Sequence, residues 1–383
     1  MQRPAGFFPK RNPVFQSAGR SYFMMRKSLA IILLLSLLGL CLGSCSGQGA
    51  GAEKTPLVVF AAGSLIIPFD HIEKAFEEKY PNIDVQSEYH GSIQVIRHAT
   101  ELHKPIDVVT TADAALIPML MYATNLPETE QPYANWHIRF ASNHLALAYQ
   151  TESKYANEIN AENWTEIISR PDVKIGIADP RFDASGYRAL MAFALAEIAN
   201  ENYGLFSPMF DRQFTFPVTI FRGDELTTIT VPEILETKSG SHIVIRGASI
   251  QLIALLESGD LDYAFEYESV IQQHDLKMVS LPAEVNLGED ENKELYQQVQ
   301  VNLDFQRFAS IKPQFRGERI GYGITIPASA LHPDQAAQFI AFLLSAEGRN
   351  LMEADHHPMF ETFIADGHKN LPSRLQAITT PME

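Results

Sequence analysis

Cysteine is almost absent from this chain. The two that it contains, Cys41 and Cys45, both lie within its first 45 residues. The sequence from residue 46 onward therefore has no thiol, which excludes a disulfide framework, a thiolate metal site and a cysteine nucleophile from that part of the chain. Its stability must come from packing, and 383 residues with 46% apolar and 20% charged residues supply enough material for two modest cores.

Basic residues are also scarce relative to acidic ones. The chain has 30 Lys and Arg against 46 Asp and Glu, a formal net charge of −16. The first 44 residues hold six of the basic residues and no acidic one, so their removal takes the charge from −16 to −22. Such an acidic protein is not expected to bind nucleic acid or an anionic membrane surface. A small anion could bind only through local dipoles, because the overall field repels it.

The apolar run Leu29–Leu42 holds too few residues for a comfortable membrane-spanning helix. Because Arg26 and Lys27 precede it, the run is typical of a secretory signal, and we expect a signal peptide over residues 1–44. Residues 1–23 do not fit such a signal, so a translation start at Met24 or Met25 is an alternative to the printed one.

The end of this run, Leu42-Gly43-Ser44-Cys45, resembles the bacterial lipobox, and a small polar segment, Ser46–Ala52, follows it. The resemblance implies that Cys45 is lipidated and becomes the mature N-terminus, with residues 45–55 as a tether. The alternative is an uncleaved anchor helix with an incidental cysteine. We expect a protein on the periplasmic or extracytoplasmic face of the cell envelope, held to the membrane by a lipid anchor only.

Signatures of common enzyme classes are missing. The sequence has no P-loop and no GxGxxG, its histidines form no HExxH spacing, and no GxSxG elbow is present. Glu266 and Glu268 flank Tyr267, and strand alternation predicts that both carboxylates lie on the face opposite the tyrosine. We therefore expect no catalytic residues and no resident cofactor.

Strands alternate with helices from residue 57 onward. Buried-strand patterns occur at Leu57–Phe60, Ile83–Val85 and Ile106–Val109. Helical spacing of apolar residues occurs between them, at Phe69–Tyr80 and Ile93–Leu102. This alternation predicts a parallel sheet with right-handed crossovers.

A second α/β run follows a connecting strand at Leu145–Tyr149. Its predicted elements are, in order, strand Ile175–Ala178, helix Tyr187–Asn200, strand His242–Ile245, helix Ile250–Glu257 and strand Tyr263–Phe265. A second connecting strand at Gly321–Pro327 and an amphipathic helix at Pro333–Glu353 complete the pattern. We predict two α/β lobes joined by two chain crossings, with residues 56–143 and 281–383 in lobe I and residues 144–280 in lobe II.

Four predicted helices begin with small or hydroxyl-bearing residues, two in each lobe. These starts are Gly63-Ser64, Gly91-Ser92, Ala184-Ser185-Gly186 and Ala248-Ser249. Helix N-termini present unpaired N–H groups and a partial positive charge, and serine adds a hydroxyl donor. A serine that merely caps its helix is the simpler interpretation of any one of these sites. The matching pairs in both lobes favour a cage of neutral donors around an anion. The phenol of Tyr267 is a candidate fifth donor, although a half-buried aromatic at a strand end explains it equally well.

Longer stretches around these starts carry a family resemblance. Ala62-Gly63-Ser64, Gly91-Ser92, Asp179–Arg188 and Asp262–Tyr267 resemble the molybdate/tungstate-binding proteins of ABC importers, in particular the archaeal-type tungstate branch. The resemblance runs from about Leu57 to about Glu353. It implies the two-lobed type II periplasmic-binding-protein fold, with a mixed, mainly parallel sheet flanked by helices in each lobe. It also implies a monomer that delivers a small oxyanion to a membrane permease and its ATPase.

The resemblance further implies which positions contact the anion. They are Gly63, Ser64, Ser92, Asp183, Ala184, Ser185 and Tyr267. The family places two carboxylates near the metal, and Asp183 matches the first, which makes it a candidate direct ligand of molybdenum or tungsten. The second should fall at Ser249, where the carboxylate is lost. We expect Ser249 to donate to an oxo group. With only one carboxylate, both four and six oxygens around the metal are compatible with the sequence.

Four alternatives accompany this interpretation. Sulfate or phosphate could take the place of the metal oxyanion, and a partly protonated phosphate would use Asp183 as an acceptor. Asp183 could also simply cap its helix without contacting a ligand. An envelope enzyme on the same scaffold would need a second catalytic group beside Asp183, and a ligand-sensing domain would need a membrane partner.

Overall fold

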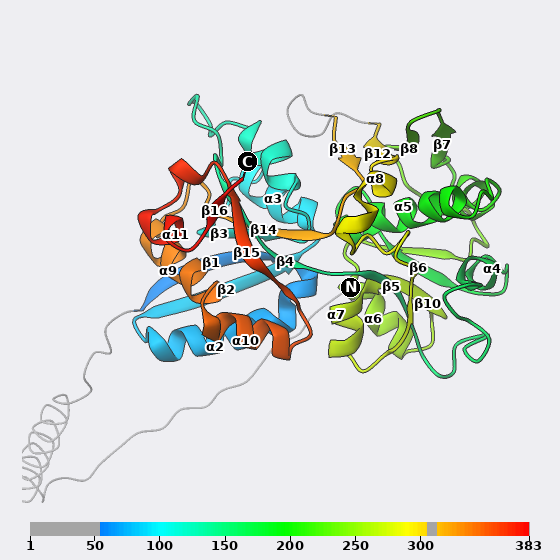
Figure 1. The fold of residues 1–383 in the computed structure, drawn as a ribbon, viewed down its shortest axis with the longest axis horizontal. Helices are drawn as coiled ribbons and strands as arrows, with labels where there is room; N and C mark the ends of the chain where they lie inside the picture. The colour runs from blue at the N-terminus through cyan, green and yellow to red at the C-terminus, as the bar shows by residue number, and fades with distance from the viewer. Residues whose placement is uncertain (1–53, 305–311, 383) are drawn as a thin grey trace, which may run out of the picture. The chain divides into compact units, whose positions relative to one another are not determined.

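The computed structural model describes residues 54–304 and 312–382, which form a mixed α/β structure with three sheets (Figure 1). The expected signal peptide, the lipidation site Cys45 and most of the tether lie outside the described residues. Among the described residues, no helix is both long and apolar enough to cross a membrane.

The first lobe is built on a seven-stranded sheet with the order β16-β15-β4-β14-β3-β1-β2. Its strands are β1 (Thr55–Ala62), β2 (Ile83–His90), β3 (Val108–Thr111), β4 (His137–Ser142), β14 (Gly321–Thr325), β15 (Met359–Asp366) and β16 (Thr380–Pro381). Strand β1 pairs in parallel with β2 and β3, whereas β14 pairs antiparallel with β3 and β4. The helices of this lobe are α2 (Ile66–Lys79), α3 (Ser92–Thr100), α9 (Pro333–Leu343), α10 (Ala346–Ala354) and α11 (Ser373–Gln376).

The second lobe is built on a five-stranded sheet with the order β11-β5-β10-β6-β9. Its strands are β5 (Leu145–Tyr149), β6 (Ile175–Ala178), β9 (Ile243–Arg246), β10 (Tyr263–Tyr267) and β11 (Lys277–Ser280). Strand β6 pairs in parallel with β9 and β10, and β5 pairs antiparallel with β10 and β11. Its helices are α4 (Trp164–Ile168), α5 (Ala184–Ala199), α6 (Ile250–Glu257) and α7 (Glu268–Gln273).

A third, four-stranded sheet corrects the predicted boundary between the lobes. It has the order β13-β12-β8-β7, from β7 (Thr219–Arg222), β8 (Thr227–Val231), β12 (Val299–Leu303) and β13 (Gln314–Arg316), and α8 (Lys293–Tyr296) precedes β12. We expected the chain to return to the first lobe at residue 281. Instead β12 pairs in parallel with β8, and the first described strand to rejoin the seven-stranded sheet is β14. The two expected chain crossings are present, but the second comes after β13.

Aromatic packing holds the helices of each lobe on its sheet. In the first lobe, the Phe76 ring of α2 meets the Phe339 ring of α9 edge to face, with centroids 5.2 Å apart. In the second, the Phe193 ring of α5 contacts both Trp164 and Phe265, at centroid distances of 5.2 and 5.9 Å. All five side chains are buried. Such contacts replace the covalent cross-links that the described residues cannot form.

One predicted helix is divided in two. The pattern at Pro333–Glu353 gives α9 and α10, because Ser345 lies between them as the N-cap of α10 and its Oγ accepts a hydrogen bond from the Gly348 amide at 3.3 Å. A capping serine satisfies the first free amides of a new helix, which allows the chain to change direction there.

Candidate functional site

The four helix starts singled out in the sequence are all present. Ser64 lies in a 3-10 turn, Gly63–Leu65, that leads into α2, and Ser92 is the first residue of α3. Ala184 is the first residue of α5, and Ser249 is the N-cap of α6. Each of the four side chains is at most 4% exposed. The pattern therefore predicted the four helix starts correctly, and the structure adds that the residues that open them are buried.

Two glycines allow the starts from the two lobes to approach each other. A Cβ atom at Gly63 would lie 2.9 Å from Cγ2 of Ile250, the first residue of α6. A Cβ atom at Gly91 would lie 2.4 Å from the carbonyl oxygen of Phe182 and 3.0 Å from that of Gly247. Both separations are closer than real Cβ contacts allow. Helix starts from separate lobes therefore meet at this place, Gly91 against backbone atoms of the second lobe and Gly63 against the Ile250 side chain.

Asp183 occupies part of this place. It is the N-cap of α5, and its Oδ1 accepts a hydrogen bond from the Ser185 amide at 2.8 Å. Its Oδ2 accepts one from the Ser249 amide, at the start of α6, at 3.3 Å. Burial raises the pKa of the Asp183 carboxyl to about 6, against the lowering effects of these amides and of Arg188. The capping role considered for Asp183 is thus confirmed, and this single carboxylate joins two helix starts.

Several hydroxyl groups around Asp183 keep a hydrogen to donate. The Oγ of Ser92 accepts from the Ala112 amide at 2.9 Å, and the phenol oxygen of Tyr267 accepts from Arg188 at 2.7 Å, so both O–H hydrogens point elsewhere. Ser185 is fully buried, and its Oγ has no hydrogen-bond partner among the described residues. An unpaired buried hydroxyl is costly unless a ligand satisfies it. The arrangement is therefore suited to a ligand that accepts hydrogen bonds.

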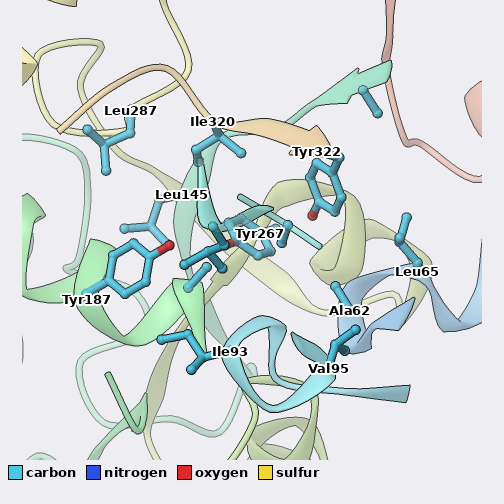
Figure 2. Close-up of a cluster of buried hydrophobic side chains, with 14 of the residues drawn as sticks. Ala62, Leu65, Ile93, Val95, Leu145, Tyr187, Tyr267, Leu287, Ile320 and Tyr322 are labelled. Atoms are coloured by element: carbon cyan, nitrogen blue, oxygen red, sulfur yellow. The ribbon is translucent and has the colours of Figure 1, made fainter. Parts of the chain in front are cut away.

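Ser64 reaches the same region from the first lobe. Its Oγ lies 2.8 Å from the phenol oxygen of Tyr322 on β14, and the rings of Tyr322 and Tyr267 lie 6.2 Å apart, tilted edge to face. Figure 2 shows the side chains of Tyr187, Tyr267 and Tyr322 arranged around this region, together with Ala62 and Ile93. Tyr322 follows the second chain crossing. The site therefore includes a residue from the strand that returns to the first lobe.

Arg188 and Asp113 connect the lobes and were not identified from the sequence. Arg188 donates to the Ala112 carbonyl at 2.8 Å and lies 3.4 Å from Asp113, while the Tyr187 hydroxyl also donates to the Asp113 carboxylate. All of these side chains are at most 5% exposed. Arg188 lies one helical turn after Ala184, so a search along that helix face would have found it. Its guanidinium orients the Tyr267 phenol from a position beside the helix starts.

Glu266 contacts the site, which the sequence analysis did not predict. The sequence placed its carboxylate away from the Tyr267 face, and alternation along β10 does separate the two side chains. However, Oε1 of Glu266 accepts a hydrogen bond from the Ser249 hydroxyl at 3.0 Å and from the Tyr267 amide at 2.8 Å. Helix α6 packs on the opposite face of β10 and begins near the end of the sheet at which β10 ends. Glu266 therefore lies beside the helix starts. The Ser249 hydroxyl, expected to serve an oxo group, is directed to this carboxyl.

Comparison with known proteins places the chain in a family. Residues 57–356 match the model of the family described as bacterial extracellular solute-binding protein. A molybdate/tungstate-binding protein of Thermococcus kodakarensis is 34% identical over 362 residues, covering 92% of this chain and 96% of the relative. A protein of the same name from Pyrococcus abyssi is 35% identical over 359 residues, covering 92% and 96%.

Solved structures support the fold. The periplasmic molybdate-binding protein of Azotobacter vinelandii matches with a TM-score of 0.50 at 13% identity, covering 80% of this chain and 100% of that one. The sulfate-binding protein SubI of Mycobacterium tuberculosis matches with a TM-score of 0.52 at 13% identity, covering 80% and 88%. These likenesses bear on the fold alone, and they agree with the two-lobed periplasmic-binding-protein type. The chain belongs to the bacterial extracellular solute-binding protein family.

Proposed function

We propose that this protein captures molybdate or tungstate between its two lobes and delivers it to a membrane permease and its ATPase. The observation that carries this proposal is the set of buried hydroxyl donors with hydrogens to spare, above all that of Ser185, where helix starts from both lobes meet. A fully deprotonated tetrahedral dianion has acceptors only, so fixed neutral donors match it. The two relatives named as molybdate/tungstate-binding proteins support the choice of anion.

In this proposal each helix start supplies one part of the cage. The backbone at Gly63 and Ala184 presents amides, and the hydroxyls of Ser64, Ser92, Ser185 and Tyr267 donate to the oxo oxygens. The Ser249 amide holds the Asp183 carboxylate beside them. Asp183 accepts hydrogen bonds from the amides of two helix starts and is the candidate direct ligand of the metal. Closure of the lobes completes the cage, because each lobe holds only part of the donors.

We also propose that the protein acts as a monomer attached to the outer face of the membrane through a lipid on Cys45, without catalysis or a resident cofactor. Replacement of Cys45 by serine is expected to move the protein from the membrane fraction to the soluble fraction. If the variant stays with the membrane in the presence of high salt, an uncleaved helix holds the chain instead.

Calorimetric titration of the purified domain from residue 54 onward with molybdate, tungstate, sulfate and phosphate tests the choice of ligand. We expect heat and a rise in melting temperature with the two metal oxyanions, and much weaker responses to the other two. If sulfate binds tightly and neither molybdate nor tungstate does, the proposed ligand is wrong and the assignment as an oxyanion-binding protein stands.

A further inference from the structure

Glu266 presents a buried carboxyl group with one satisfied and one unsatisfied oxygen. Its side chain is fully buried, and Oε1 accepts both the Ser249 hydroxyl and the Tyr267 amide. Its Oε2 has no hydrogen-bond partner among the described residues. When a carboxyl with two donors on one oxygen takes up a proton, that proton resides on the other oxygen. Oε2 then becomes an O–H donor that lacks an acceptor.

The charged groups around Glu266 favour this neutral form. Asp183 precedes α5 and shares Ser249 with Glu266, since the Ser249 amide donates to Asp183 and its hydroxyl donates to Glu266. Tyr267 follows Glu266 on β10 and engages Arg188 of α5, while Tyr322 approaches from β14. Burial, with the Asp183 charge adding to it, raises the pKa of the Glu266 carboxyl to about 8. The guanidinium of Arg188 is committed to Tyr267, Ala112 and Asp113.

A dianion that enters this cluster meets two carboxyl groups. Two negative carboxylates beside a dianion would repel it strongly at low dielectric. No donor among the described residues pairs with Oε2 of Glu266 and so reduces this repulsion. A protonated Glu266 removes one of those charges and adds a donor. It thereby converts a repulsive neighbour into a binding group.

On this basis, and resting on the oxyanion function proposed above, we propose that Glu266 is a proton-donating residue of the anion site. Its Oε2–H donates a hydrogen bond to an oxygen of the bound dianion, and binding at alkaline pH takes up one proton from solvent. The same proton returns to solvent when the anion leaves. A tetrahedral dianion is therefore bound together with a proton, and its release is favoured as pH rises.

The test measures proton uptake by calorimetry in two buffers of different ionisation heat, from about pH 7 to about pH 9.5, with tungstate and, in parallel, sulfate. Neither anion titrates in this range. For the wild type we expect uptake approaching one proton per anion at the alkaline end, with affinity falling by up to about tenfold per pH unit. Glu266→Gln keeps a neutral donor of the same shape and should bind with no proton uptake and a flat profile. Glu268→Gln, whose carboxylate pairs with His144, is the matched control and should behave as the wild type.

The outcomes separate the two proposals. Absence of proton uptake in the wild type at the alkaline end, or equal uptake in Glu266→Gln, overturns the role of Glu266 while leaving the anion site in place. Proton-linked binding of sulfate without tungstate binding supports Glu266 and overturns the choice of metal oxyanion. If neither dianion binds, both proposals fall.

Discussion

Replacement of Gly91 by alanine isolates the contribution of lobe closure to binding. Gly91 precedes α3 with φ −60° and ψ 142°, a conformation that alanine adopts freely, so the fold of the first lobe should not change. The added methyl group would lie 2.4 Å from the Phe182 carbonyl oxygen and 3.0 Å from that of Gly247, both backbone atoms of the second lobe. Normal contacts require a retreat of about 1 Å at this point.

The expected loss follows from the hydrogen bonds made across the same contact. The amides of Ile93 and Gln94 donate to the Phe182 carbonyl at 3.0 and 3.3 Å. Each such bond contributes about 0.5–1.5 kcal/mol net, so their joint loss amounts to roughly 1–3 kcal/mol. Binding that depends on closure should therefore weaken by about 5- to 150-fold.

Calorimetric titration with tungstate measures the affinity, and small-angle scattering of the liganded protein reports incomplete closure. Gly204→Ala is the control, because its nearest neighbour would lie 3.6 Å from the new Cβ, an ordinary contact. An unchanged affinity for Gly91→Ala, or a large fall in the melting temperature of the ligand-free protein, would refute this reasoning.

Three further predictions follow from the site. Ser185→Ala should weaken tungstate binding about tenfold without lowering the ligand-free melting temperature, because it removes a buried hydroxyl without a partner; a clear loss of stability would contradict this. Arg188→Met should lower the free energy of unfolding in urea by about 3 kcal/mol, because it leaves Asp113 buried without its cation. Arg188→Lys should recover part of that loss. Equal stability of the Arg188→Met variant and the wild type would count against the ion pair. Burial raises the pKa of Glu266 from its ordinary 4.5 to about 8 in the folded protein. Between pH 4.5 and pH 8 the folded protein therefore binds a proton that the unfolded chain has lost. The free energy of unfolding should fall as pH rises through this range, by up to about 1.4 kcal/mol per pH unit. Urea titrations at several pH values should show a flatter dependence for Glu266→Gln than for the wild type.

The local elements could be predicted from the sequence because their patterns are local. Strand β6 at Ile175–Ala178 and helix α6 at Ile250–Glu257 coincide with their predicted bounds, and small or hydroxyl-bearing residues mark the helix starts. The return to the first lobe was misplaced because pairing of β12 with β8 depends on partners distant in sequence. No periodicity within residues 281–320 reports such a pairing.

The sequence indicated the helix starts that meet at the site but not the charged groups beside them. Small residues before a helix have a recognisable spacing, which identified Ser64, Ser92, Ser185 and Ser249. Glu266 was set aside because alternation along one strand gives the face of a side chain but not which helix starts beneath it. Arg188 lies in a largely apolar helix, and only the fold brings it to Asp113 and Tyr267.

The pairing of β8 with β12 also bears on the order in which a nascent chain can fold. The central pair of the third sheet can form only after residues 299–303 have been synthesised, because they pair with residues 227–231. The seven-stranded sheet needs β14 to β16 near the C-terminus. An emerging chain that stops at residue 280 holds all strands of the five-stranded sheet, but it lacks strands of both the four-stranded and the seven-stranded sheet. Folding of these two sheets therefore ends late in synthesis, and a single cooperative unfolding transition is expected in place of two independent ones.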